Sequence, residues 1–91
     1  MTKPPKYLIV ASAPDVAETF ARRNLFVPES WIFMRTPRQF ESKKNALAIF
    51  LDGWRERPDH ARMIQAANEA EFRMIRIVHA APDQVLETWD A

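Results

Sequence analysis

The segment from Asp52 to Arg57 carries the residue types best suited to recognition chemistry. Gly53 is the only glycine in the chain, and glycine adopts positive φ angles or allows a close backbone approach at little steric cost. It precedes Trp54, Arg55 and Arg57. An indole can stack on a base or a ring, and guanidinium groups pair with carboxylates or phosphates. The segment therefore predicts a recognition surface.

The same segment also has a purely structural interpretation. In that case Gly53 turns the chain where a strand ends, and Trp54 folds over the top of the core. Arg55 then pairs with Glu56 or Asp59. The sequence leaves both interpretations open.

Groups that could perform catalysis are few. Ser12, Asp52, His60 and His79 could form a serine–histidine–aspartate arrangement or a histidine metal pair. However, the chain has no nucleophile elbow and no pair of histidines at helical spacing. The lack of cysteine excludes disulfides, thiolate zinc sites and cysteine nucleophiles. We therefore expect no catalytic residue and no metal ion.

A phosphate-binding turn is the other chemistry to test. The turn at residues 11–15 reads Ala-Ser-Ala-Pro-Asp, without the glycines of a dinucleotide fingerprint or the glycine-lysine of a P-loop. Helix N-termini attract anions, but Pro14 removes one amide and Asp15 already supplies a negative charge. We expect no cofactor. The alternative to a binding module is a nucleotide or anion site near Ser12, Asp52, Gly53, Arg55 and Arg57.

Basic residues surround Phe40 and could follow a nucleic-acid backbone. Arg35 and Arg38 belong to one edge of the expected sheet, whereas Lys43 and Lys44 belong to the opposite edge. The chain also has thirteen basic and twelve acidic residues, so its net charge is only +1. We therefore expect no nucleic-acid binding, and we group Arg35 and Arg38 with the candidate recognition surface.

The elements that position these residues follow from the apolar pattern. Four apolar runs have the composition typical of strands, at residues 7–11, 31–34, 46–51 and 72–78. Each precedes a proline that opens a periodic stretch, which predicts helices at about 14–25, 37–43, 58–70 and 82–90. Alternating strands and helices predict an α/β fold with a four-stranded parallel sheet, Rossmann-like and specifically flavodoxin-like.

The expected strand order is 2-1-3-4, because this order centres the two most continuously apolar long strands. The connection from Arg35 to Asn45 has only eleven residues, slightly short for a crossover, so 1-2-3-4 is the alternative. Arg73 and Arg76 indicate that the fourth strand is an edge. If the second strand is the other edge, it is entirely apolar, and another copy could cover it to form a homodimer.

The expected helix faces are apolar stripes against the sheet. The first uses Val16, Ala17, Phe20, Ala21 and Leu25; the third uses Ala61, Met63, Ile64, Ala66, Ala67 and Ala70; the last uses Val85, Leu86 and Trp89. Trp89 is either a lid on the core or an exposed anchor for a partner.

Length and composition describe one domain over residues 1–91, with residues 1–5 expected to be flexible. The longest apolar run, 46–51, is far below the ~20 residues that a membrane-spanning helix needs. The run 7–11 is too short for a signal-peptide core. We expect a cytoplasmic protein that does not associate with membranes.

Three segments together resemble a known group of proteins: 7–12, 31–37 and the run from Leu51 to Asp59, whose glycine-tryptophan followed by arginine-proline-aspartate is the most specific part. The pattern is similar to small Rossmann-like proteins encoded by bacteriophages. The resemblance covers residues 6 to about 79. It implies a phage accessory protein and transfers no catalytic residue.

These observations favour a non-catalytic interaction module that binds a host or phage protein. The contact surface would be the carboxyl edge of the sheet or an exposed edge strand. In open parallel sheets, the carboxyl edge is where ligands bind. We expect it to gather Ser12, Arg35, Arg38, the 52–57 segment and His79.

Overall fold

The computed structural model describes residues 4–86. Its centre is a parallel sheet of four strands in the order β2-β1-β3-β4, the flavodoxin-like topology. The strands are β1 (Tyr7–Val10), β2 (Trp31–Phe33), β3 (Ala46–Leu51) and β4 (Ile75–Ala80). The predicted fold and strand order are confirmed, and the alternative order is wrong because β1 pairs with both β2 and β3.

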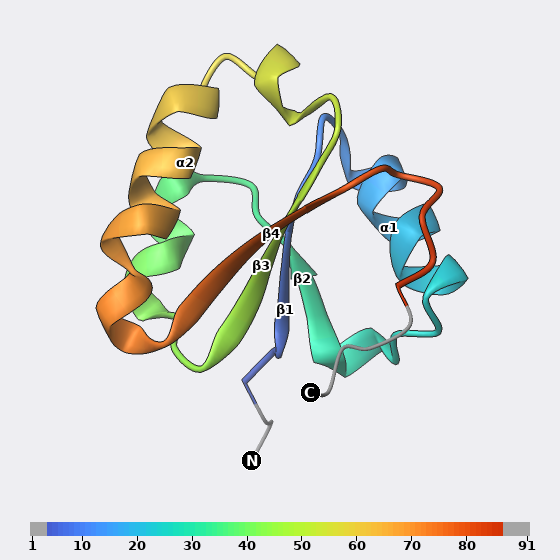
Figure 1. The fold of residues 1–91 in the computed structure, drawn as a ribbon, viewed down its shortest axis with the longest axis horizontal. Helices are drawn as coiled ribbons and strands as arrows, with labels where there is room; N and C mark the ends of the chain where they lie inside the picture. The colour runs from blue at the N-terminus through green and yellow to red at the C-terminus, as the bar shows by residue number, and fades with distance from the viewer. Residues whose placement is uncertain (1–3, 87–91) are drawn as a thin grey trace.

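Helices cover both faces of the sheet (Figure 1). Helix α1 (Pro14–Arg23) lies on one face, and helix α2 (His60–Glu69) lies on the other together with the short 3-10 helix η2 (Pro37–Ser42). Successive side chains of a strand point to opposite faces. The core is therefore two layers, with Leu8 and Val10 packed on the α2 side and Ile9 on the α1 side.

Helix α1 is shorter than the sequence predicts, because a Schellman motif ends it. Leu25 N donates to Arg22 O (3.1 Å) and Phe26 N donates to Ala21 O (2.9 Å). Leu25 has a positive φ of 59° and is 87% exposed, so it is not part of the apolar stripe. Phe26 packs instead, with its ring stacked 4.1 Å from that of Tyr7.

Helix α2 also begins later than predicted, at His60. Met63 and Ala67 are buried as expected, but Ala61 is exposed at the first turn. The face that covers the sheet is therefore narrower than the one predicted.

The predicted second helix is a 3-10 helix instead of an α-helix. A 3-10 helix rises about 2.0 Å per residue, against about 1.5 Å in an α-helix. It therefore spans more length per residue, which suits a connection that must pass from β2 across β1 to β3. Its Phe40 is buried and joins the core on the α2 side.

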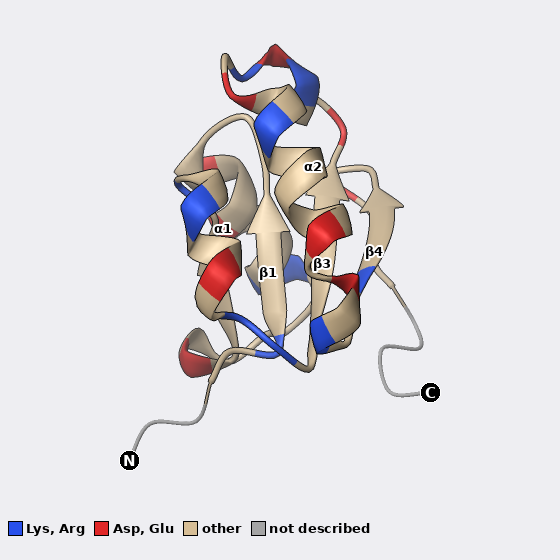
Figure 2. Cartoon of the chain, turned by 90° about the vertical axis from the view of Figure 1, so that its left-hand side faces the viewer, with Lys and Arg blue, Asp and Glu red and all other residues tan. Residues whose placement is uncertain are grey.

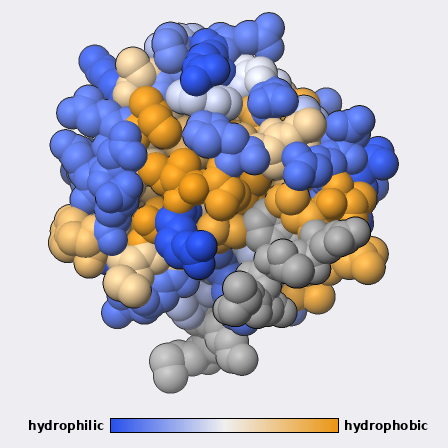
Figure 3. Space-filling model, in the orientation of Figure 1, coloured by the Kyte–Doolittle hydropathy of each residue, from blue (hydrophilic) through white to orange (hydrophobic). Residues whose placement is uncertain are grey.

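The fourth strand starts three residues later than predicted, at Ile75. Residues Glu71–Arg73 form the 3-10 helix η4. Arg73 is not in the strand, because its guanidinium group donates to Lys43 O (2.9 Å) and Phe40 O (2.6 Å). Strand β4 is an edge as predicted, and a band of hydrophobic surface crosses the middle of the face where it lies in front (Figure 3).

The predicted helix at 82–90 is wrong over residues 82–86, which form a turn and an irregular segment. Asn24 holds this segment at the end of α1. Its Nδ2 donates to Gln84 O (3.0 Å), and its Oδ1 accepts from Leu86 N (2.8 Å). In a helix that starts at Pro82, Leu86 N would donate to Pro82 O, four residues earlier, but it donates to Asn24 instead, so this helical hydrogen bond does not form. Trp89 and residues 1–3 lie outside the described residues.

Within residues 4–86, no helix has the length and apolarity needed to cross a membrane.

Candidate functional site

Arg57 lies at the carboxyl edge of the sheet, where its side chain bonds to the segments that follow β1 and β2. Its Nη1 donates to Ala11 O (3.2 Å), just after β1, and to Met34 O (2.8 Å), just after β2. Its Nη2 donates to Arg35 O (2.9 Å). The Arg57 side chain is only 9% exposed. One guanidinium group therefore satisfies carbonyls that follow two neighbouring strands.

Asp59 completes this contact. Its two carboxylate oxygens accept from Nε (2.9 Å) and Nη2 (3.0 Å) of Arg57. Such a paired geometry holds the guanidinium plane in one orientation. Asp59 precedes α2 but makes no side-chain cap for it. The arginine-proline-aspartate spacing signals this pair, whereas the three carbonyl contacts depend on the fold and could not be found from sequence.

Gly53 has the positive φ that the sequence suggested, at 100°. It precedes the 3-10 helix η3 (Trp54–Glu56), where Glu56 N donates to Gly53 O (3.0 Å). A Cβ at this position would lie 3.9 Å from Ser12 Oγ. The turns after β1 and β3 therefore lie side by side.

Trp54 covers the core, as the structural interpretation predicted, and is 5% exposed. Its ring lies 4.8 Å from that of Phe50 in an edge-to-face contact. Arg55 lies over the outer side of this indole, with Cζ 5.1 Å from the ring centroid. The predicted ion pair of Arg55 with Glu56 or Asp59 is wrong for residues 4–86. Asp59 pairs with Arg57, and Arg55 makes a cation–π contact instead.

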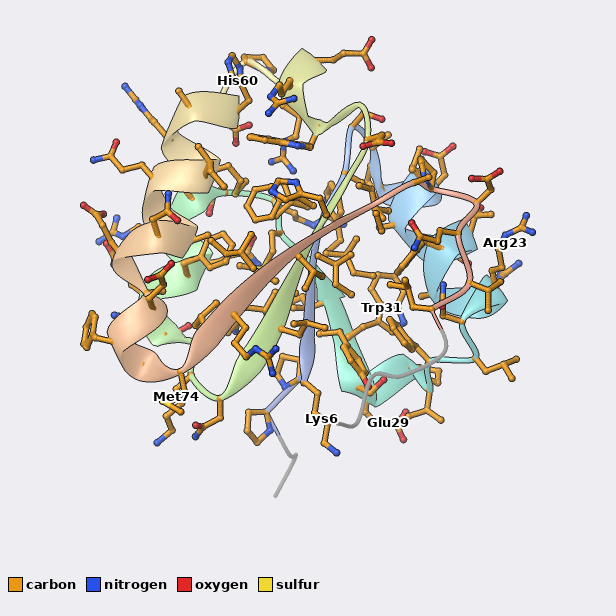
Figure 4. All side chains as sticks on the ribbon, viewed as in Figure 1. Lys6, Arg23, Glu29, Trp31, His60 and Met74 are labelled. Carbon is orange, nitrogen blue, oxygen red and sulfur yellow. The ribbon has the colours of Figure 1, made fainter. Side chains whose placement is uncertain are left out.

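The two histidines also contact Trp54. The rings of His60 and His79 lie 6.3 Å and 6.4 Å from the Trp54 ring. His60 Nδ1 lies 2.8 Å from Arg57 O, an acceptor, so this nitrogen carries the proton in that contact. Figure 4 shows His60 at the same end of the molecule as η3. No three His, Asp or Glu side chains of the described part of the chain gather in a way that could hold a metal ion.

The remaining predicted site residues are exposed around the buried contacts of Trp54 and Arg57. They are Ser12, Arg35, Arg38, Asp52 and Arg55. Arg38 approaches Glu41 at 3.7 Å, with both side chains mostly in solvent. Arg35 N and Thr36 N both donate to Gln39 Oε1, which shapes the turn after β2. Figure 2 shows acidic and basic residues interspersed over the loops at this end of the sheet.

The carboxyl edge thus has an internal and an external part. Trp54 and Arg57 are internal and make contacts within the fold, whereas Arg35, Arg38 and Arg55 are external. Residue type could not separate these two sets, because each contains arginine.

Comparisons with protein-family models, with curated proteins and with solved structures found no match.

Proposed function

We propose that this chain is a small non-catalytic module that binds another protein through the carboxyl edge of its sheet. The observation that carries the proposal is the division between internal and external arginines. Arg57 holds the loops in place through contacts inside the fold. Arg35, Arg38 and Arg55 then extend from these loops into solvent.

The chemistry of this surface favours a partner that presents carboxylates. Arginine pairs with carboxylates through two parallel hydrogen bonds and is enriched at protein interfaces. The cation–π contact with Trp54 orients Arg55 before binding, which lowers the entropy lost when a partner is engaged.

A nucleotide- or anion-binding domain is the second candidate. It is favoured by the contact between the turns after β1 and β3, where Ser12 lies beside Gly53. In open α/β sheets, ligands bind where the strand order reverses. Against it, the Arg57 guanidinium group already occupies the space beyond β1 and β2 and is bonded to carbonyls and to Asp59.

The resemblance to small Rossmann-like proteins of bacteriophages supports a more specific form of the first candidate. In that form the chain is a phage accessory protein that acts in the host cytoplasm, and its partner is a host or phage protein.

The test is affinity capture from host lysate with the wild-type chain and with the double variant Arg38→Ala, Arg55→Ala. The matched control is Arg23→Ala, Arg76→Ala, which removes two exposed arginines from other surfaces. We expect a partner that wild type and control retain and the edge variant loses. An unchanged partner set in the edge variant contradicts the proposal. Trp54 is unsuitable for this test because its removal would disturb the core.

Thermal-shift measurements with nucleotides and phosphorylated metabolites separate the two candidates. A ligand that binds only the folded chain raises its melting temperature. Stabilisation by one nucleotide that the Arg38→Ala, Arg55→Ala variant does not show would favour the second candidate.

A further inference from the structure

A different surface, the free edge of β2, carries a second inference, which shares only Arg35 with the carboxyl edge. Met34 N donates to Ile9 O (2.9 Å), toward β1. Peptide groups alternate in direction along a strand, so Ile32 also faces β1 and the backbone groups of Trp31 and Phe33 face outward. An outward row of N–H and C=O groups is a template for another strand.

A groove of about 560 Å³ follows this edge. It is lined by Glu18 and Arg22 of α1, by Trp31 and Phe33 of β2, and by Gln39 of η2. An added strand would lie about 4.7–4.9 Å from β2, beside the side chains of β2 that line this groove. The two sheet edges differ, since β2 contains no charged residue, whereas β4 carries Arg76 and His79.

Opposite charges flank β2 at equal separations in the sequence. Glu29 lies in the 3-10 helix η1 (Pro28–Ser30), three residues before Ile32, and Arg35 follows Ile32 by three residues. Both are exposed, and within residues 4–86 neither forms an ion pair with another side chain. Figure 4 shows Glu29 beside Trp31, at the end of the molecule opposite His60.

We propose that two copies of this chain associate by antiparallel pairing of β2 with β2, about a two-fold axis at Ile32. In this register, Trp31 lies opposite the partner's Phe33 and the two residues exchange backbone hydrogen bonds. Because the start of one β2 lies beside the end of the other, η1 brings Glu29 near the partner's Arg35, and the symmetry repeats this ion pair. A two-fold interface must be self-complementary, and this spacing of charges makes β2 complementary to itself. A second copy is therefore the occupant that the groove fits.

Helix α1, which borders the groove, fits the same arrangement. Glu18 and Arg22 lie on the groove side of α1 and pair with each other at 2.6 Å. The two-fold axis makes the two α1 helices antiparallel, so the side of α1 that carries this pair faces the same side of the partner's α1. The two β2 strands become the centre of one continuous sheet.

The register is tested by cross-linking. The chain has no cysteine, so Ile32→Cys introduces a single thiol on the axis. Residues opposite each other in a non-hydrogen-bonded antiparallel pair have Cα atoms about 4.5 Å apart, within the disulfide range. We expect Ile32→Cys to form a disulfide-linked dimer on mild oxidation and Ser30→Cys, which is off the axis, to remain monomeric under denaturing electrophoresis. Equal cross-linking of the two variants, or none in a folded Ile32→Cys chain, overturns the proposal.

Charge reversal gives an independent readout in the chain without a thiol. Light scattering after size exclusion should give a mass of twice 10.6 kDa for the wild type. Glu29→Lys should raise the dimer dissociation constant by roughly tenfold or more, because it places like charges opposite each other. Adding Arg35→Glu should restore dimerisation, and Glu71→Lys, an exposed acid in another 3-10 helix, should not affect it.

A wild-type mass of one chain at the highest attainable concentration overturns the proposal, as does an unchanged mass in Glu29→Lys. The partner capture described above relies on Arg38 and Arg55, which do not take part in this pairing. The two proposals can therefore fail separately.

Discussion

The guanidinium group of Arg57 and the carboxylate of Asp59 form two parallel hydrogen bonds of 2.9 Å and 3.0 Å at the carboxyl edge of the sheet. The Arg57 side chain is 9% exposed and that of Asp59 is 28% exposed. The pair links the start of α2 to the carbonyls that follow β1 and β2. It is therefore part of what holds the candidate surface in one shape.

Replacing Arg57 by alanine should destabilise the fold. The change leaves the carbonyls of Ala11 and Met34 without their donor and Asp59 without its partner, a loss of about 3 kcal/mol. Urea denaturation measures it. Arg57→Lys should restore little, because an ammonium group cannot reproduce the fork. The exposed Arg55→Ala is the control and should change the free energy of unfolding by less than about 0.5 kcal/mol. Equal effects of the two alanine variants would contradict the internal role of Arg57.

Gly53→Ala should lower stability by about 1–2 kcal/mol, because an L residue at a φ of 100° is strained. The nearest atom to an added Cβ is Glu56 Oε2 at 3.4 Å, the end of a flexible side chain, so the loss comes from the backbone. Thermal denaturation gives the measurement. Gly53→Asn should lose less than Gly53→Ala, since asparagine tolerates the left-handed region better. The reverse order would show that space, not φ, limits this position.

Leu25→Gly should stabilise the chain. Leu25 occupies the left-handed position of the Schellman motif, with a φ of 59°, and its side chain is 87% exposed. Glycine removes the strain at this position, for a gain of about 1 kcal/mol. Val27→Gly serves as control, because Val27 is also exposed but has a φ of −71°. It should be neutral or destabilising in the same melting experiment, and a similar gain in both variants would reject the explanation.

Asn24→Ala should release the segment at residues 81–86 from α1. The variant loses the side-chain contacts with Gln84 O and Leu86 N, worth about 1 kcal/mol each. Hydrogen exchange should show faster exchange at the Leu86 amide with little change in β1 or β3. Asn68→Ala, at an exposed position of α2, should leave the Leu86 amide unchanged. Slow exchange of Leu86 in the Asn24 variant would mean that other contacts hold the segment.

The strand order was predictable because burial depends on residue type. Strands β1 and β3 are continuously apolar, and the centre of a sheet with helices on both faces is where such strands lie. The boundaries were less predictable. Leu25 continues the helical pattern of apolar residues, yet the backbone turns there, because the bonds from Phe26 to Ala21 close the helix. Arg73 likewise leaves the expected strand to bond Lys43 O and Phe40 O, which lie far away in sequence.

The sequence by itself determined the class of fold, the order of strands and the position of the one turn that needs a glycine. These features depend on residue type and on spacing between residues that are close in sequence. Only the tertiary structure decided which arginine is internal. Arg55 and Arg57 are chemically identical and two residues apart, but only Arg57 reaches the carbonyls after β1 and β2. Those carbonyls are brought together by strand pairing between distant segments, which no local pattern encodes.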